Sequence, residues 1–136
     1  MPRLLRKLLV FWIPIAVYIA LIVSLSSMTR PPVLLSFPLS DKLLHFAEYA
    51  ILAILIARAL CSLDLLGCSV WKVGAATVAA ALFIGGLDEL YQSLVPHRCA
   101  EWLDLAADCL GAVAGVAIYF LVAGFAARRR VTAADG

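Results

Sequence analysis

The chain has 136 residues, of which 65% are hydrophobic and 15% are charged, with a formal net charge of +2. A soluble domain is about 45–50% apolar and about 25% charged, so this composition argues against a soluble globular protein. The basic residues are dispersed and flank apolar runs, which argues against nucleic-acid binding. We expect one polytopic membrane domain over residues 1–136.

The chain opens with a basic stretch that contains Arg3, Arg6 and Lys7, followed by an uncharged run over residues 8–26. This layout resembles a signal peptide, but signal-peptide cores have about 7–15 residues, and this run is long enough to cross a bilayer. We therefore expect a retained membrane helix over about residues 8–26. Pro14 is expected to kink it, because proline removes one backbone donor.

Three further apolar segments follow. Residues 27–40 are rich in proline and serine and are expected to form a loop, after which Ser40 can cap a helix and Asp41 can stabilise its positive end. Helices are predicted over about residues 42–60, 70–95 and 103–127, with short loops between them. The last one stops at three arginines, and a disordered tail is expected beyond. The sequence thus predicts an all-α bundle of four transmembrane helices.

Charge divides unevenly between the two ends of these helices. Four spans place both termini on one side of the membrane, and that side receives eight lysines and arginines against three on the other. The positive-inside rule therefore predicts cytoplasmic termini. The opposite, outer ends receive most of the acids and both histidines: Asp41, Glu48, Asp88, Glu89, Glu101, Asp104, Asp108, His45 and His97. This segregation predicts one polar pocket at the outer leaflet.

Helical spacing indicates which of these side chains share a face, since residues three, four and seven apart are neighbours on a helix. The second helix has two such stripes, the third has one with Glu89 beside it, and the fourth has one. The members of the stripes are Asp41, His45 and Glu48; Lys42, His45 and Tyr49; Gly85, Asp88 and Gln92; and Asp104, Asp108, Gly111 and Gly115. A Gly-x-x-x-Gly pair allows close helix approach in lipid. We expect the three polar faces to meet.

The four cysteines are Cys61, Cys68, Cys99 and Cys109. No pair of them has the Cys-x-x-Cys spacing of a metal or redox site. We expect all four to be small apolar fillers and expect no disulfide framework.

Two blocks of this sequence resemble the VanZ-like family of bacterial membrane proteins. The first block is Asp41-Lys42-x-x-His45-Phe46-x-x-Tyr49-x-x-Leu52. The second comprises Asp88-Glu89-x-x-Gln92, Pro96-x-Arg98, and Asp104-Leu105-x-x-Asp108-x-x-Gly111-x-x-x-Gly115. The resemblance covers about residues 41–119. The family usually has asparagine where this chain has Asp108, and the extra acid could bind a cation, stay protonated or pair with Arg98.

The resemblance implies a four-helix protein of the bacterial inner membrane and cell envelope. The family is named for a component that gives low-level resistance to the glycopeptide teicoplanin. A similarity to membrane enzymes acting on lipid head groups has been suggested for it, which suits a polar pocket at the outer leaflet.

Our first hypothesis is an enzyme or binding protein for a phospholipid or polyprenyl-linked head group. His45 would be the general base or nucleophile, because the pKa of histidine lies near the operating pH, with Glu48 orienting it. Asp104 completes the expected catalytic set. Arg98 and Lys42 would hold phosphate, and the remaining predicted substrate contacts are Tyr49, Gln92 and Asp108. Asp88 and Glu89, with Asp104, would bind a divalent cation such as Mg²⁺.

Two alternatives stand beside this hypothesis. The protein could be a non-enzymatic envelope or assembly factor whose polar cluster is a structural network; intramembrane hydrogen bonds average about 0.6 kcal/mol and can fix helix register. An ion or proton carrier is less favoured, because a transport path needs polar groups through the bilayer midplane, and the charges here gather at one end.

Overall fold

The computed structural model describes residues 2–28, 39–63, 66–96 and 100–134, and every regular element in these ranges is helical. The elements are α1 (Arg3–Lys7), the π-helix η1 (Leu8–Trp12), α2 (Ile13–Ser26), α3 (Ser40–Leu63), α4 (Val70–Gln92) and α5 (Trp102–Ala134). The first three run on as one helical segment, so that four segments are long and apolar enough to cross a membrane: Leu5–Ser26, Ser40–Leu63, Val70–Gln92 and Trp102–Ala127. The predicted all-α bundle of four membrane helices is confirmed.

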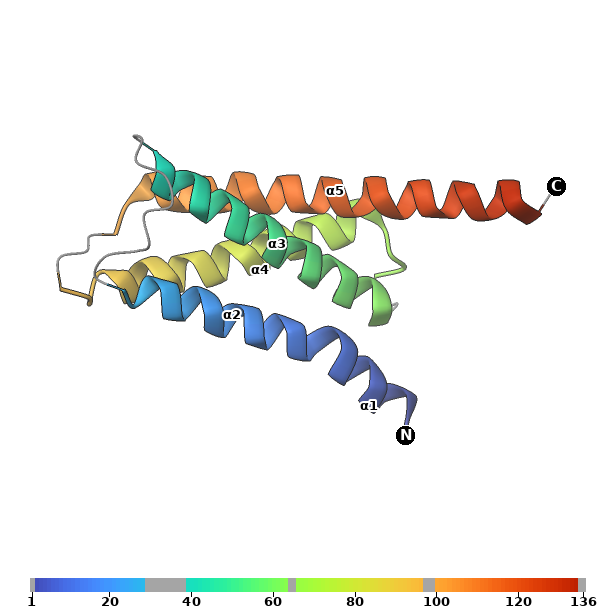
Figure 1. The fold of residues 1–136 in the computed structure, drawn as a ribbon, viewed down its shortest axis with the longest axis horizontal. Helices are drawn as coiled ribbons and strands as arrows, with labels where there is room; N and C mark the ends of the chain where they lie inside the picture. The colour runs from blue at the N-terminus through green and yellow to red at the C-terminus, as the bar shows by residue number, and fades with distance from the viewer. Residues whose placement is uncertain (1, 29–38, 64–65, 97–99, 135–136) are drawn as a thin grey trace.

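The segments run alternately up and down along the bundle (Figure 1). The start of α1 and the end of α5 lie at one end of the molecule. The end of α2, the start of α3, the end of α4 and the start of α5 lie at the other. This second end, called the polar end below, carries the acidic residues of α3, α4 and α5.

Two predicted helix ends are wrong. The third predicted helix stops at Gln92 rather than at residue 95, and turn bonds from Leu94 N to Tyr91 O and from Val95 N to Gln92 O, both 3.0 Å, close it off. Pro96 explains this end, because a proline disfavours helical backbone in the residue before it. The expected disordered tail is helical through Ala134. Arginine and alanine are strong helix formers, and no glycine or proline interrupts residues 128–134.

The irregularity expected at Pro14 takes the form of a widened helical turn. The π-helix η1 ends at Trp12, and Pro14 occupies the first turn of α2. A proline lacks the N–H of a regular helix, and its ring collides with the carbonyl four residues earlier, which a π-helical turn relieves.

The closest helix pair is α3 with α5. A Cβ added at Gly111 would overlap the backbone carbonyl of Phe46, and one added at Gly115 would overlap that of Ala50. The two backbones therefore touch where any larger residue would hold them apart. This confirms the close approach predicted from the Gly-x-x-x-Gly pair.

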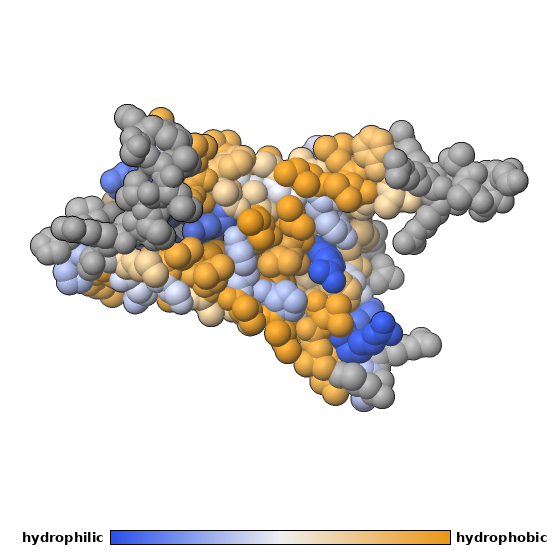
Figure 2. Space-filling model, viewed as in Figure 1, coloured by the Kyte–Doolittle hydropathy of each residue, from blue (hydrophilic) through white to orange (hydrophobic). Residues whose placement is uncertain are grey.

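The interior is small and the outer surface is apolar. Tyr49, Leu52 and Ala53 of α3 are the centre of the buried core, joined by Ile22 of α2 and Ala112 of α5. Large apolar side chains elsewhere point outward, and apolar residues dominate the middle of the face in Figure 2, with hydrophilic residues toward the two ends. This is the distribution expected of a bundle that faces lipid.

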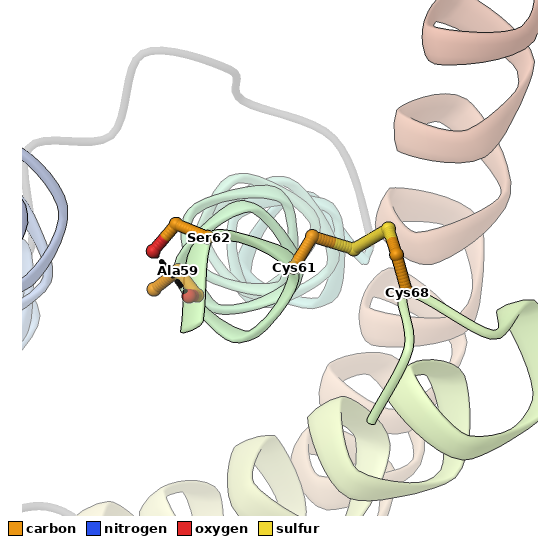
Figure 3. Close-up of a disulfide and its surroundings, with 4 residues drawn as sticks. All are labelled: Ala59, Cys61, Ser62 and Cys68. Carbon is orange, nitrogen blue, oxygen red and sulfur yellow. Dashed lines mark hydrogen bonds between the residues drawn. A yellow bond between two sulfur atoms is a disulfide. The ribbon is translucent and has the colours of Figure 1, made fainter. Parts of the chain in front are cut away.

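Our expectation of no disulfide is wrong. Cys61 and Cys68 form a disulfide between the last turn of α3 and the loop before α4 (Figure 3), and their Cα atoms lie 4.7 Å apart. Gly67 and Cys68 both have positive φ angles, so the backbone reverses there and brings Cys68 back to the helix. The spacing of known motifs did not indicate this pairing. Cys109 is a free, half-buried thiol, and Cys99 lies outside the described residues.

Candidate functional site

A buried pair joins α3 to α5 at the polar end. Nδ1 of His45 lies 3.0 Å from Oδ1 of Asp108, and the two residues are 9% and 1% exposed. Asp108 lies one helical turn before Gly111, and His45 is adjacent to Phe46, whose carbonyl Gly111 contacts. The glycine that allows the helices to touch therefore also sets the distance between histidine and acid.

Glu89 brings the third helix to this pair. One ligand-type atom from each of His45, Glu89 and Asp108 lies within 4.8 Å of the others, and all three residues are buried. Oε2 of Glu89 accepts a 2.9 Å hydrogen bond from the backbone N–H of Glu101, which fixes the carboxylate. One turn earlier on α4, a Cβ at Gly85 would lie 2.7 Å from Oδ2 of Asp108. The absence of a side chain at Gly85 makes room for this carboxylate.

A second group surrounds Lys42. Its Nζ lies 2.8 Å from Oδ2 of Asp41, 2.6 Å from Oε2 of Glu101 and 2.5 Å from Oδ1 of Asp104. Asp104 is buried, whereas the side chains of Asp41 and Glu101 are exposed. Lys42 is thus a shared counter-ion for three acids.

A third group ties α2 to α4. Ser26 Oγ donates a 2.7 Å hydrogen bond to Oδ2 of Asp88, and Gln92 Nε2 donates a 2.8 Å bond to the same oxygen. Both Ser26 and Asp88 are buried. Sequence reasoning missed Ser26, because a single serine in an apolar run has no spacing that links it to an acid 62 residues later.

Several buried polar atoms have no hydrogen-bond partner among the described residues. At the polar end these are the Tyr49 hydroxyl, Oδ1 of Asp88, Oε1 of Glu89 and Oδ2 of Asp108; Oδ1 of Asp104 also has none but forms an ion pair with Lys42, and Thr77 Oγ1 lies deeper in α4. Buried polar groups in native proteins are almost always paired, and an unpaired one costs about 1–3 kcal/mol. These atoms are therefore available to bind water, an ion or a ligand.

The predicted site residues separate into these groups. His45 and Asp108 pair with each other, Lys42 and Asp104 form an ion pair, and Gln92 bonds to Asp88. Tyr49 is fully buried with its ring beside Gly85. The predicted faces of α3, α4 and α5 do converge, as expected.

Two predicted groupings differ from the contacts in the structure, and one predicted residue cannot be compared. The carboxylate within hydrogen-bond distance of His45 is that of Asp108, while Glu48, which we expected to orient His45, is half-buried on α3. Asp88 and Glu89, predicted to share a metal ion, reach different partners, because consecutive residues on a helix point about 100° apart. Arg98 lies outside the described residues.

Among the described residues, two groups could hold a metal ion by the kind and closeness of their ligands. One comprises His45, Glu89 and Asp108; the other comprises Asp41, Glu101 and Asp104. The second group already surrounds the Lys42 ammonium.

The comparison with known families agrees with the two sequence blocks. The chain matches the family model described as VanZ/LLP1 over residues 3–123, a range that includes the first membrane segment as well as the three helices of the polar cluster. No curated protein and no solved structure matches the chain. The resemblance noted from residues 41–119 is confirmed over a longer stretch, and the chain belongs to the VanZ/LLP1 family.

Proposed function

We propose that the polar end of this VanZ/LLP1-family membrane protein binds the phosphate-containing head group of an envelope lipid, either a phospholipid or a polyprenyl-linked precursor. The observation that carries this proposal is the set of buried, unpaired polar atoms on Tyr49, Asp88, Glu89 and Asp108. A cluster that served only to hold helices together would pair its own donors and acceptors, because each unpaired group costs stability. The three carboxylate oxygens are acceptors, so we infer that donor groups of the head group, or a cation that also binds its phosphate, supply their partners.

The position of the cluster supports a lipid as that ligand. Asp88 and Glu89 lie in the last two turns of α4, Asp108 in the second turn of α5 and Tyr49 in the third turn of α3, so the unpaired atoms lie toward one end of membrane-length helices. The flanks of the bundle are apolar, with Leu43, Leu90 and Leu103 exposed close to the cluster. A lipid can therefore place its chains on the outer surface and its head group at the polar end.

The proposal places the polar end at the outer leaflet of the bacterial inner membrane, with both termini in the cytoplasm. The distribution of lysines and arginines supports this orientation. The lipids available there are phospholipids and the polyprenyl-linked carriers of cell-wall precursors, so both belong in the test.

The test uses the full chain in detergent and measures the shift in melting temperature on adding phosphatidylglycerol, undecaprenyl phosphate or diacylglycerol, which lacks phosphate. The phosphate-containing lipids are expected to stabilise the protein, and His45→Ala is expected to abolish that shift. Lys72→Ala, on an exposed residue at the opposite end of α4, is the matched control and keeps it. Equal stabilisation by diacylglycerol, or none by any lipid with or without a divalent cation, would contradict head-group binding.

The same samples separate binding from the structural alternative. Under head-group binding, His45→Ala stays folded without lipid, although the loss of its contact with Asp108 lowers the melting temperature, and the lipid-dependent shift is abolished. Under a purely structural network, the variant loses stability without lipid, and lipid changes both proteins equally. Release of head-group fragments into the aqueous phase, measured by mass spectrometry, reports turnover.

A further inference from the structure

Two groups of three acidic or histidine side chains lie at the polar end, and only one of them surrounds a lysine. Asp41, Glu101 and Asp104 surround Lys42, whose Nζ is 2.5–2.8 Å from an oxygen of each. The other group is formed by His45, Glu89 and Asp108. In the described part of the chain, no lysine or arginine forms an ion pair with either of these two acids.

Each acid of the second group is held by one oxygen and leaves the other without a partner. Oε2 of Glu89 accepts from Glu101 N, while Oε1 has no hydrogen-bond partner. Oδ1 of Asp108 lies 3.0 Å from His45 Nδ1, while Oδ2 has none. Both residues are more than nine-tenths buried, at 7% and 1% exposed. The contact that holds Glu89 comes from Glu101, outside the group of three, and an outer contact of this kind is how proteins orient a metal-binding carboxylate.

The free oxygen of Asp108 faces the helix that carries Glu89. Oδ2 of Asp108 lies against Gly85 of α4, at 2.7 Å from where a Cβ would be, and Glu89 follows one turn later on the same helix. The ligand-type atoms of the three residues all lie within 4.8 Å of one another. Nitrogen and oxygen ligands of one zinc ion, each about 2.0–2.2 Å from the metal, are about 3–4 Å apart. Binding an ion would therefore require the three side chains to move slightly inward.

We propose that His45, Glu89 and Asp108 together bind one divalent transition-metal ion, of the Zn²⁺ or Mn²⁺ class. When ionised, the two carboxylates carry two negative charges; the imidazole can supply at most one positive charge, whereas a divalent ion supplies two, and buried charges in proteins are paired or bound to metal. One imidazole nitrogen with two carboxylates suits zinc or manganese, whereas Mg²⁺ and Ca²⁺ prefer oxygen ligands alone. The group contains no thiolate, which disfavours soft ions such as Cu⁺.

The ion gives an acidic site a means of holding phosphate. Lys42 is already shared among three acids, so it has little positive charge left for an anion. Three protein ligands leave an open position at a zinc ion, which water or a substrate oxygen can occupy. This role of the ion rests on the proposed function, with a phosphate oxygen of the lipid at the open position; the ion site itself rests on the three side chains.

The test measures metal alone before any lipid is added. The full chain in detergent is treated with a chelator and dialysed against Zn²⁺, Mn²⁺ or Mg²⁺, and bound metal is counted by mass spectrometry. One Zn²⁺ or Mn²⁺ per chain is expected, with affinity at least tenfold above that for Mg²⁺. Asp108→Asn and Glu89→Gln are expected to lower the affinity at least tenfold, and Asp41→Asn, in the group around Lys42, is the matched control.

Several results would overturn the site. The site is contradicted if the wild type binds no metal, if its affinity for Mg²⁺ equals that for Zn²⁺, or if Asp108→Asn and Glu89→Gln bind metal as tightly as the wild type. It is also contradicted if ethanolamine, an organic cation, stabilises the metal-free wild type and added Zn²⁺ does not displace it. Melting curves without metal show whether each variant is folded. If one variant is unfolded, the other is compared with the wild type. The number of metal ions bound per wild-type chain tests the site without either variant.

A second step separates this inference from the proposed function. The lipid shift is measured on the same protein with one equivalent of Zn²⁺ and after chelation. Metal binding without any lipid shift leaves the ion site standing and contradicts the proposed function. A lipid shift of equal size in both samples supports head-group binding and contradicts the role of the ion in it. A shift that requires Zn²⁺ supports both.

Discussion

Asp108 Oδ2 occupies the space that a side chain at Gly85 would fill. A Cβ built there would lie 2.7 Å from that oxygen, 3.3 Å from a methyl group of Leu105 and 3.4 Å from the ring of Tyr49. The Asp108 carboxylate on α5 therefore requires that residue 85 of α4 has no side chain. Two glycines in succession make this relationship easy to test, because the neighbouring Gly86 has nothing within 4 Å of its Cβ position.

Gly85→Ala is expected to displace the Asp108 carboxylate. The lipid concentration needed for half of the stabilisation is expected to rise at least tenfold. The effect of the substitution on folding should be smaller, because alanine favours helix over glycine by about 1 kcal/mol and offsets part of the crowding. The melting temperature with and without lipid measures both effects. Gly86→Ala is the control, expected to keep binding and to gain a little stability. Equal behaviour of the two variants would show that the crowding at Asp108 has no consequence.

Ser26→Ala removes the buried hydrogen bond from α2 to Asp88, together with the longer bond from Gln92 Nε2 to Ser26 Oγ. The variant leaves Oδ2 of Asp88 with Gln92 as its remaining partner. We expect a loss of about 0.6–1.7 kcal/mol, the range measured for hydrogen bonds between membrane helices. Unfolding in mixed detergent measures it.

Ser24→Ala is the matched control for Ser26. Ser24 is exposed and donates to the carbonyl of Ala20 in its own helix, so its removal breaks no contact between helices. A loss as large in Ser24→Ala as in Ser26→Ala would show that helix propensity, rather than the bond to Asp88, sets the effect.

Lys42→Met is expected to destabilise the protein more than the double variant Lys42→Met/Asp104→Asn does. Removing one partner of a buried ion pair costs about 3–5 kcal/mol because the other charge stays buried, and replacing both avoids this cost. The Asp104 side chain is 8% exposed and that of Lys42 is 15% exposed. The pair is therefore mostly buried, and the cost of removing Lys42 alone is expected to approach this range. A double-mutant cycle on unfolding free energies provides the coupling. Strictly additive effects would mean that the two charges do not depend on each other.

The redox state of Cys61 and Cys68 in cells is expected to report the orientation of the chain. Disulfides persist in oxidising compartments and are rare in the cytosol. With both termini in the cytoplasm, as the basic residues predict, the loop between α3 and α4 is cytoplasmic and its two cysteines are expected to be reduced in growing cells and to pair once oxidised. Alkylation of intact cells with a mass-tagged maleimide, before and after reduction, measures this.

A control and a second probe complete this experiment. Cys61→Ser/Cys68→Ser gives the background labelling of the other two cysteines. A pair that is fully oxidised in growing cells contradicts the cytoplasmic orientation and places the polar end on the opposite side. A reporter fused after residue 136, active on one side of the membrane only, checks the result independently.

Long apolar runs made the four membrane segments predictable, and helical spacing made the convergence of α3, α4 and α5 predictable. Both are properties of one helix at a time. The partner of His45 was harder, because Glu48 and Asp108 are both acids near it and only the packing at Gly111 decides which is within reach. The same holds for Ser26, whose role depends on where α2 lies against α4.

The disulfide was missed for a related reason. Spacing motifs describe cysteines within one regular element, whereas Cys61 ends a helix and Cys68 follows a backbone reversal. Asp88 and Glu89 show the opposite error, in which neighbours in sequence were expected to act together. Their side chains diverge around α4 and reach different helices.

The His45–Asp108 pair also sets an order of events during membrane insertion. The two residues are 63 positions apart, and Asp108 arrives with the last membrane segment. At about 5–20 residues per second of synthesis, His45 waits about 3–13 s for its partner. Until then α3 crosses the bilayer with its polar face uncovered, which is costly for ionisable groups in a membrane. A ribosome stalled before α5 would therefore leave a three-helix chain with exposed polar groups, a form that quality-control proteases and insertion chaperones can recognise.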